Sequence, residues 1–146
     1  MKAISLHRPW AQWVALGLKT VETRTHDRFK GLVGQRIAIH AAQKWDYDWK
    51  IKVADYGKLD LFPGFEGDPI WRPGLLCMVF VSDGKQIPAE PFYHVMDVNR
   101  LALCDIRGRY CLLLNDLKVL EKPIPWKGGR GIFNVPDEVL KNANNL

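Results

Sequence analysis

The chain is poor in the residues that build several common kinds of site. It has three cysteines among 146 residues, an odd number with no CxxC pair, so the sequence indicates neither a disulfide framework nor a zinc site. The four histidines also lack metal-ligand spacing. The two serines, Ser5 and Ser82, do not lie in a GxSxG segment, which argues against serine-hydrolase chemistry. We therefore expect no metal, no cofactor and a reducing, cytoplasmic location.

Long apolar runs are also missing. No segment approaches the roughly 18 apolar residues that a membrane-spanning helix needs, so we expect no membrane partner. The first ten residues are interrupted by His7, Arg8 and Pro9, unlike a signal peptide. The 47% of apolar and 25% of charged residues suit a soluble protein with one buried core. The sequence predicts a single domain over residues 1–146.

Negative charge is scarce in the first third of the chain. Residues 1–44 contain eight Lys and Arg against two acidic residues, a net +6, whereas the remaining thirteen basic and fourteen acidic residues sum to −1. Concentrated positive charge attracts polyanions, which makes nucleic acid the first partner to consider. A solvated surface that only keeps the protein soluble explains the charge equally well.

Strands and short helices alternate irregularly along the predicted fold. Apolar runs and β-branched residues predict strands over residues 3–6, 20–25, 36–42, 74–84 and 109–126. Helical spacing predicts helices over residues 10–16 and 49–56 and from residue 136 onward. The Gly-Pro-rich residues 58–73 predict a long loop that can cover a site, and residues 87–103 predict irregular structure with a partial helix over 92–96. Five or six strands with inserted short helices indicate an α+β fold built as a small mixed β-barrel.

The stretch GLKTVETR sets three charges within six positions, namely Lys19, Glu22 and Arg24. Glu22 and Arg24 share one face of the predicted strand, about 6.5–7 Å apart along the backbone. Three interpretations are open. The charges can form an ordinary surface ion pair; the cations can hold a phosphate while Glu22 accepts from a base edge; or Lys19 can act as a base in proton transfer.

The six tryptophans differ in the role that their surroundings predict. Trp13 and Trp49 fall on the apolar stripes of the predicted helices, so we expect them in the core. Trp10 lies next to Arg8, and Trp71 lies in the loop that can cover a site. We therefore expect Trp10 and Trp71 to form an exposed platform on which a base can stack.

Two further features favour structural roles. His40 ends an apolar strand, where a histidine is most often buried with its hydrogen bonds satisfied. The segment KGGRG, residues 127–131, allows the backbone to approach a phosphate, but it lacks the Lys-Ser/Thr of a P-loop. A tight turn between a strand and the C-terminal segment is the favoured interpretation.

The segment SLHRPWAQWVALGLKTVETR resembles the opening of the ASCH family (activating signal cointegrator homology), whose signature is S-L-x-x-P-W/Y-A followed by G-x-K-x-x-E-x-R. The matching residues are Ser5, Leu6, Pro9, Trp10, Ala11, Gly17, Lys19, Glu22 and Arg24. The resemblance continues through KGLVGQRIAIHAAQKW, PGLLCMVFVSDG and KPIPWKGGRGIFNVPDEVL, and so covers nearly the whole chain.

The resemblance implies a PUA-like fold, a small mixed β-barrel with flanking short helices and a cleft beside the first helix. It also implies binding of RNA or of a modified nucleotide in that basic cleft. The binding residues are then Lys19, Glu22, Arg24, Arg8, Trp10 and Trp71. An interaction module that takes an acidic peptide in the same cleft is a further alternative.

Hydrolysis is the enzymatic alternative that the resemblance implies, because some relatives deacetylate N4-acetylcytidine and others cleave RNA. The deacetylating relatives use a Lys, a Thr and a distant Glu, without a metal. Here Lys19 matches the Lys, Glu22 stands where those relatives have Thr, and Glu90 is the candidate for the distant acid. As an enzyme, the chain would use Lys19, Glu22 and Glu90.

Overall fold

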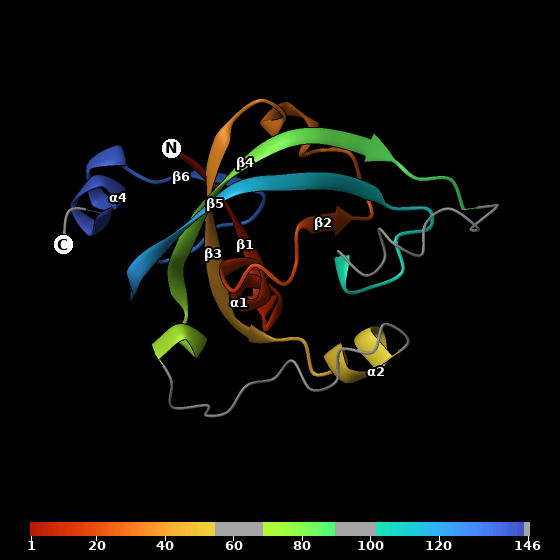
Figure 1. The fold of residues 1–146 in the computed structure, drawn as a ribbon, viewed down its shortest axis with the longest axis horizontal. Coiled ribbons are helices and arrows are strands. Elements are labelled where there is room, and N and C mark those ends of the chain that lie inside the picture. Colours follow the sequence, from red (N-terminus) through yellow and green to blue (C-terminus); the bar gives the residue numbers. More distant parts are fainter. Residues whose placement is uncertain (55–68, 90–101, 145–146) are drawn as a thin grey trace.

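A six-stranded mixed sheet forms the centre of the molecule in a computed structural model (Figure 1), which describes residues 1–54, 69–89 and 102–144. The strands are β1 (Lys2–Arg8), β2 (Val21–Arg24), β3 (Arg36–Trp45), β4 (Gly74–Gln86), β5 (Tyr110–Ile124) and β6 (Ile132–Asn134). The helices are α1 (Trp10–Ala15), α2 (Trp49–Ala54) and α4 (Asp137–Asn144), and 3-10 turns occur at η1 (Lys30–Leu32) and η3 (Pro69–Trp71).

The strand order is β2-β5-β4-β3-β1-β6, and the sheet curls into a half-barrel. β1 runs parallel to β3, whereas the other neighbouring pairs are antiparallel. The predicted α+β class and small mixed barrel are confirmed. β6 was not predicted as a strand. Of the predicted loop over 58–73, residues 69–71 form η3, while residues 58–68 and the partial helix expected over 92–96 lie outside the described residues.

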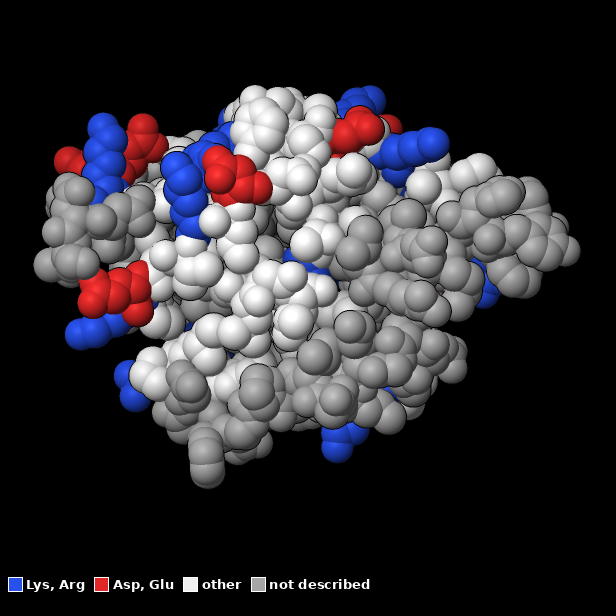
Figure 2. Space-filling view, viewed as in Figure 1, with Lys and Arg blue, Asp and Glu red and all other residues white. Residues whose placement is uncertain are grey.

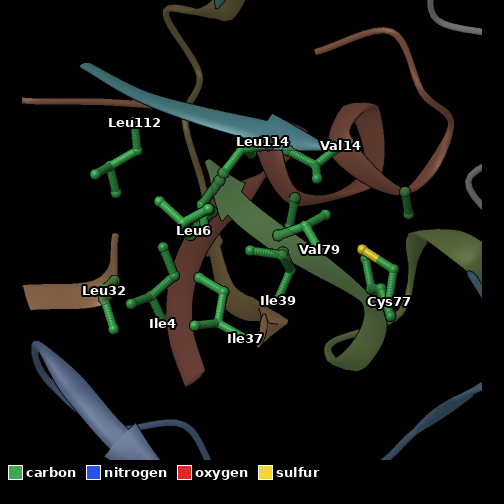
Figure 3. Packing of buried hydrophobic residues seen from close by; sticks show 14 of the residues in the cluster. Ile4, Leu6, Val14, Leu32, Ile37, Ile39, Cys77, Val79, Leu112 and Leu114 are labelled. Atoms are coloured by element: carbon green, nitrogen blue, oxygen red, sulfur yellow. The ribbon is translucent and has the colours of Figure 1, made fainter. Parts of the chain in front are cut away.

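Both faces of the central strands are packed, which explains why their sequences are apolar at consecutive positions. On the concave face, α1 packs against side chains of β1, β3, β4 and β5 that include Ile4, Ile39, Val79 and Leu112 (Figure 3). On the other face, Leu140 of α4 belongs to a second cluster. Strands buried on two sides lose the hydrophobic alternation that half-exposed strands show.

A third cluster fixes the position of α2 and of the segment that precedes β5. Trp13 of α1 packs against Trp49 and Val53 of α2 and against Leu103. The rings of Trp13 and Trp49 meet edge to face with centroids 5.5 Å apart. Both rings are buried, so the prediction that they belong to the core is confirmed. Through Leu103, the same cluster anchors the residues that form one wall of the candidate site.

The two ends of the described chain are joined at α4. The amino group of Met1 donates to the Asp137 carboxylate at 2.6 Å and to the Val135 carbonyl at 2.7 Å. The N-terminal ammonium holds the pKa of Asp137 below its usual range. The helix begins at Asp137, one position after Pro136, where the sequence predicted its start. No helix in residues 1–54, 69–89 and 102–144 is long and apolar enough to cross a bilayer.

Candidate functional site

The candidate site lies where the curled sheet brings its distant strands together. β2 is one end of the strand order, and β6 pairs with β1 only along Lys2–Ile4. Beyond that pairing, Arg24 Nη2 on β2 donates to the Ser5 carbonyl on β1 at 3.1 Å. Strands at opposite sides of the sheet are therefore bridged by a side chain instead of a backbone ladder.

A cavity of about 760 Å³ opens beside this bridge, and we call it the seam cavity. Its volume lies in the range of about 300–1,000 Å³ typical of small-molecule sites. It is lined by Ser5, Leu6, His7, Trp10, Lys19, Glu22, Thr23, Arg24, Thr25, His26, Asp46, Ile51, Lys52, Cys104, Asp105, Arg107 and Arg109. Four of the six binding residues predicted from the sequence are among them.

Lys19 reaches the seam cavity because the chain turns sharply after α1. Gly17 has φ +76°, a left-handed conformation that suits glycine at the end of a helix. The amides of Leu18 and Lys19 then both donate to the Trp13 carbonyl, at 2.9 and 3.1 Å. This turn delivers Lys19 to the start of β2.

The Lys19 side chain is almost completely buried, with 2% of its surface exposed. Its Nζ donates to the carbonyls of Val21 at 2.7 Å and Ala102 at 2.6 Å. It also lies 5.2 Å from the centre of the Trp10 ring, a cation–π distance. Lys19 therefore ties β2 to the segment before β5, and it forms part of the cavity lining instead of extending into solvent.

Glu22 is also buried, with 6% of its surface exposed. Oε1 accepts a hydrogen bond from the Thr23 amide at 2.7 Å. Glu22 is one of the residues that line the cavity, and its Oε2 is buried without a hydrogen-bond partner among the described residues. Buried polar atoms of folded proteins nearly always have a partner, so this oxygen marks a place for a donor.

Arg24 is oriented by two contacts that leave part of its guanidinium unused. Besides the bond to the Ser5 carbonyl, the guanidinium carbon lies 4.8 Å from the centre of the Phe29 ring. Arg24 Nε is buried and has no partner among the described residues. The motif thus places an unpaired donor and an unpaired acceptor, on Arg24 and Glu22, in the lining of one cavity.

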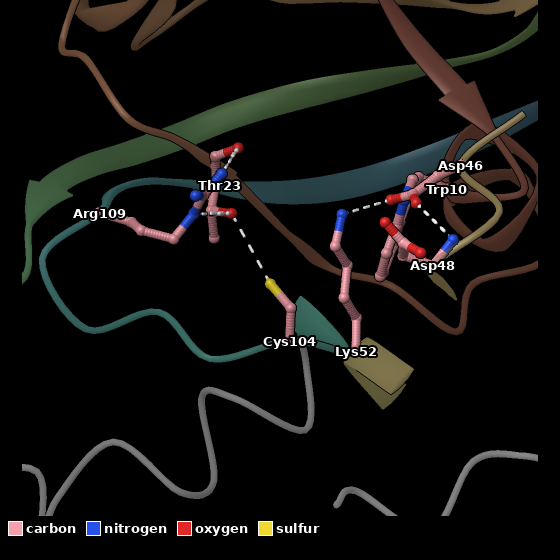
Figure 4. Close-up of polar contacts among 7 residues, drawn as sticks. All are labelled: Trp10, Thr23, Asp46, Asp48, Lys52, Cys104 and Arg109. Carbon is pink, nitrogen blue, oxygen red and sulfur yellow. Dashed lines mark hydrogen bonds and ion pairs between the residues drawn. The ribbon is translucent and has the colours of Figure 1, made fainter. Parts of the chain in front are cut away.

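One wall of the seam cavity is built around Asp46 (Figure 4). Its carboxylate accepts from Trp10 Nε1 at 2.8 Å and from Lys52 Nζ at 2.6 Å. Burial opposes ionisation of Asp46, but the hydrogen bonds from Lys52 and Trp10 outweigh it, so the pKa of this carboxyl lies below its ordinary value. The cationic head of Lys52 is held at the cavity by this pairing.

The opposite wall is built around Thr23 (Figure 4). Arg109 donates through Nε to Thr23 Oγ1 at 2.7 Å and through Nη2 to the Thr23 carbonyl at 3.2 Å. Cys104 Sγ lies 3.7 Å from Thr23 Oγ1. Nearby, Arg107 Nε donates to the Asp105 carboxylate at 2.8 Å, and this hydrogen bond lowers the pKa of Asp105.

These wall residues were not among the site residues predicted from the sequence. Thr23 sits inside the motif, but its partner Arg109 lies on a segment 86 positions later. A local spacing pattern carries no information on such a contact. A basic residue at the start of a predicted strand was the sole sequence signal for Arg109, and it is a weak one.

The structure separates two of the six predicted binding residues from the cavity. Arg8 Nη1 donates to the Trp71 carbonyl at 3.0 Å, and its guanidinium lies 5.0 Å from the Trp45 ring. Trp71 stacks on Trp45 with centroids 6.2 Å apart. Since 2% of Trp71 is exposed, the expectation of an exposed platform is wrong for this residue. Glu90, the candidate distant acid, lies outside the described residues.

His40 is buried with both ring nitrogens in hydrogen-bond contact, which confirms the structural role predicted for it. Nδ1 lies 2.8 Å from Ser5 Oγ, and Nε2 lies 2.7 Å from the Trp126 carbonyl. Burial lowers the pKa of His40. Gly128, in the connection from β5 to β6, presses against this pair: a Cβ added there would lie 2.5 Å from His40 Cε1. Through Gly128, the KGGRG segment thus packs against Ser5 of β1 and His40 of β3.

A metal site is not evident in the described part of the chain. No group of three or more His, Cys, Asp or Glu side chains in residues 1–54, 69–89 and 102–144 is arranged to hold a metal ion. The buried thiols of Cys77 and Cys111 have pKa values raised to about 12 and about 11, with burial as the main cause.

No protein-family model matches the sequence. The structure is similar to crystal structures of ASCH from Zymomonas mobilis, at 14% identity and a TM-score of 0.59 over 99% of this chain and 94% of that chain. A serine-to-alanine mutant of the same protein gives 16% identity and a TM-score of 0.60 over 99% and 94%. A tyrosine-to-phenylalanine mutant gives 15% identity and 0.58 over 99% and 96%. The chain thus has the same small α+β fold as these ASCH structures, which confirms the fold implied by the sequence resemblance.

Proposed function

We propose that this protein binds RNA and seats one nucleotide of it in the seam cavity. The observation that carries this proposal is the convergence of Lys19, Glu22 and Arg24 on one ligand-sized space. Glu22 and Arg24 both line this space, and Glu22 Oε2 and Arg24 Nε are buried without partners among the described residues. A nucleotide brings hydrogen-bond donors and acceptors in one small molecule, and so can satisfy both atoms.

The charge of the lining supports a polyanionic ligand. Five basic side chains line the cavity against three acidic ones, a formal net charge of +2. On the face shown in Figure 2, the described Lys and Arg side chains are interspersed with Asp and Glu along the upper part, so that part presents no field of one sign. The attraction of phosphates therefore depends on the cavity lining and on the basic first third of the chain.

An acidic peptide suits this lining less well than RNA does. The unpartnered oxygen of Glu22 needs a hydrogen-bond donor and repels a carboxylate. Nucleobases carry N–H donors together with ring acceptors, whereas an acidic side chain offers acceptors alone. The resemblance of the motif to a family of RNA binders points in the same direction.

Hydrolysis is supported less well by the geometry. It requires Lys19 to exchange a proton with a second carrier, but Lys19 Nζ donates to two backbone carbonyls that hold it in the fold. Incubation with N4-acetylcytidine and with end-labelled RNA, followed by chromatography, is expected to give no product. A product formed by the parent protein and absent with Lys19→Ala would replace the binding proposal with hydrolysis.

Fluorescence anisotropy of a labelled single-stranded RNA of mixed sequence, titrated at 50 to 300 mM salt, tests the proposal. Arg24→Gln removes the cavity cation whose Nε is unpartnered. We expect an affinity about tenfold or more below that of the parent, since a hydrogen bond to a charged group contributes about 1.5–3 kcal/mol. The slope of log K against log salt should fall by about 0.7, the value for one phosphate on a single strand.

Arg36→Gln is the matched control, because it removes the same charge from a residue that pairs with Asp116 and is absent from the cavity lining. Circular dichroism melts of both variants establish that each is folded. RNA that fails to bind the parent at 50 mM salt, or an Arg24→Gln variant with the parent's affinity and slope, would contradict the proposal.

A further inference from the structure

We propose that Glu22 selects the base, so that the seam cavity accepts nucleobases carrying an exocyclic amino group and disfavours those with a carbonyl at the same position. This inference rests on the proposed binding of a nucleotide in the cavity. The residue is assigned as a specificity determinant and not as a catalytic group.

The two oxygens of the Glu22 carboxylate have different surroundings. Oε1 accepts from the Thr23 amide, which fixes the orientation of the carboxylate. Oε2 is buried and has no partner among the described residues, and Glu22 is one of the residues that line the cavity. A ligand therefore meets one oriented acceptor oxygen in a side chain that is 94% buried, and not a solvated carboxylate that can rotate away.

The neighbouring cations do not neutralise this oxygen. Lys19 Nζ is engaged by the Val21 and Ala102 carbonyls, and Arg24 Nη2 is engaged by the Ser5 carbonyl. No ion pair between Glu22 and a described basic residue is present. Because the backbone supplies the acceptors for both cations, Glu22 keeps its free oxygen for the ligand.

The backbone under Glu22 is held rigidly. All four residues of β2 pair with β5, and Glu22 lies opposite Leu112. A site built on a paired strand keeps its geometry better than one on a loop, which is a condition for discriminating between similar ligands. Glu22 therefore cannot easily withdraw from a ligand that lacks the matching donor.

A carboxylate oxygen accepts hydrogen bonds and cannot donate them. The amino groups of adenine, cytosine and guanine supply the donor that Oε2 lacks. Hypoxanthine places a carbonyl where adenine has its amino group, and uracil does so where cytosine has its own. The ring N–H of uracil lies between two carbonyls, and that of hypoxanthine lies beside one, so the approach of either N–H brings an oxygen close to the carboxylate. The geometry thus favours the amino-bearing member of each pair.

Two matched pairs of nucleotides test the inference: adenosine against inosine monophosphate, and cytidine against uridine monophosphate. Their dissociation constants are measured by calorimetry, or by displacement of labelled RNA. With the parent protein we expect the amino-bearing nucleotide of at least one pair to bind about tenfold or more tightly, the discrimination typical of a base-edge contact. With Glu22→Gln, whose amide can donate to a carbonyl, we expect that preference to fall below about threefold or to reverse.

Asp116→Asn is the control for charge, because it makes the same carboxylate-to-amide change outside the cavity lining and should keep the parent's preference. The inference is overturned if the parent binds both members of each pair equally. It is also overturned if the parent's preference persists in Glu22→Gln. If neither RNA nor any of the four nucleotides binds, the proposed function itself fails. The two failures are therefore distinguishable.

Discussion

Gly128→Ala probes how tightly the β5–β6 connection packs against the strand that carries the site. A Cβ at position 128 would lie 2.5 Å from His40 Cε1, 2.6 Å from Ser5 Oγ and 2.7 Å from His40 Nδ1. Real Cβ contacts essentially never fall below 3.0 Å, so some atom must move. The His40 ring cannot move freely, because its two nitrogens contact Ser5 Oγ and the Trp126 carbonyl at 2.8 and 2.7 Å.

The expected loss of stability follows from these contacts. Forcing one extra carbon into a packed interior typically costs about 1–3 kcal/mol. Moving His40 would also weaken a hydrogen bond with a net contribution of about 0.5–1.5 kcal/mol. We therefore expect Gly128→Ala to lower the free energy of unfolding by about 2–4 kcal/mol, the middle of the combined range.

Urea denaturation followed by tryptophan fluorescence measures this loss as a lower midpoint at an unchanged m value. Gly31→Ala is the control, because no heavy atom lies within 4 Å of its added Cβ and its φ is not in the left-handed region. Its midpoint should stay close to that of the parent. Equal midpoints for Gly128→Ala and Gly31→Ala would refute the reasoning.

Two further predictions concern buried ionisable groups. Lys19→Met should reduce the free energy of unfolding by about 2–6 kcal/mol in urea denaturation, because the buried carbonyls of Val21 and Ala102 lose their donor at about 1–3 kcal/mol each. A loss below about 1 kcal/mol would contradict this. Burial lowers the pKa of His40 below its ordinary value of 6.5, so the unfolded chain binds the proton first as the pH falls. The stability contributed by neutral His40 is therefore complete above pH 6.5 and is lost as the pH falls through 6.5 toward the lowered pKa. The stability difference between the parent and His40→Gln should shrink from pH 7.5 to pH 5.5, and a constant difference would count against this.

The sequence predicted the central strands well, because β3 and β4 are buried on both faces. Strands of this kind contain continuous apolar runs that are easily recognised in the sequence. β6 was missed since its three residues, Ile132–Asn134, are too few to show a period. It forms by pairing with β1, and the signal for that pairing lies at the other end of the chain. Short edge strands of this kind are defined by tertiary contact and not by local pattern.

The candidate site was predicted where its residues are neighbours in the sequence and missed where they are distant. Lys19, Glu22 and Arg24 are close in the sequence, so their spacing and the resemblance could place them together. Their chemical roles differ more than the spacing indicated: Lys19 is engaged by backbone carbonyls, while Glu22 keeps an unpaired oxygen. The distinction depends on Ala102, a residue 83 positions away from Lys19.

Arg8 and Trp71 are the two predicted binding residues that the structure places elsewhere. Arg8 was predicted to bind the ligand near Trp10, but in the structure it makes a cation–π contact within the fold. Its partner is Trp45, and Trp71 stacks beneath that ring. The hydrogen bond from Arg8 to the Trp71 carbonyl closes this group, so Trp71 supports the fold where an exposed platform was expected.

The bridge between β2 and β1 also bears on how the protein avoids aggregation. β2 ends the sheet, and the unpaired backbone groups of a terminal strand can recruit a strand of another chain. Here Lys19 occupies the Val21 carbonyl of β2 and Arg24 occupies the Ser5 carbonyl of β1. Charged side chains thus cap acceptors on both strands beside the seam cavity, which leaves fewer free backbone groups with which a neighbouring chain can pair.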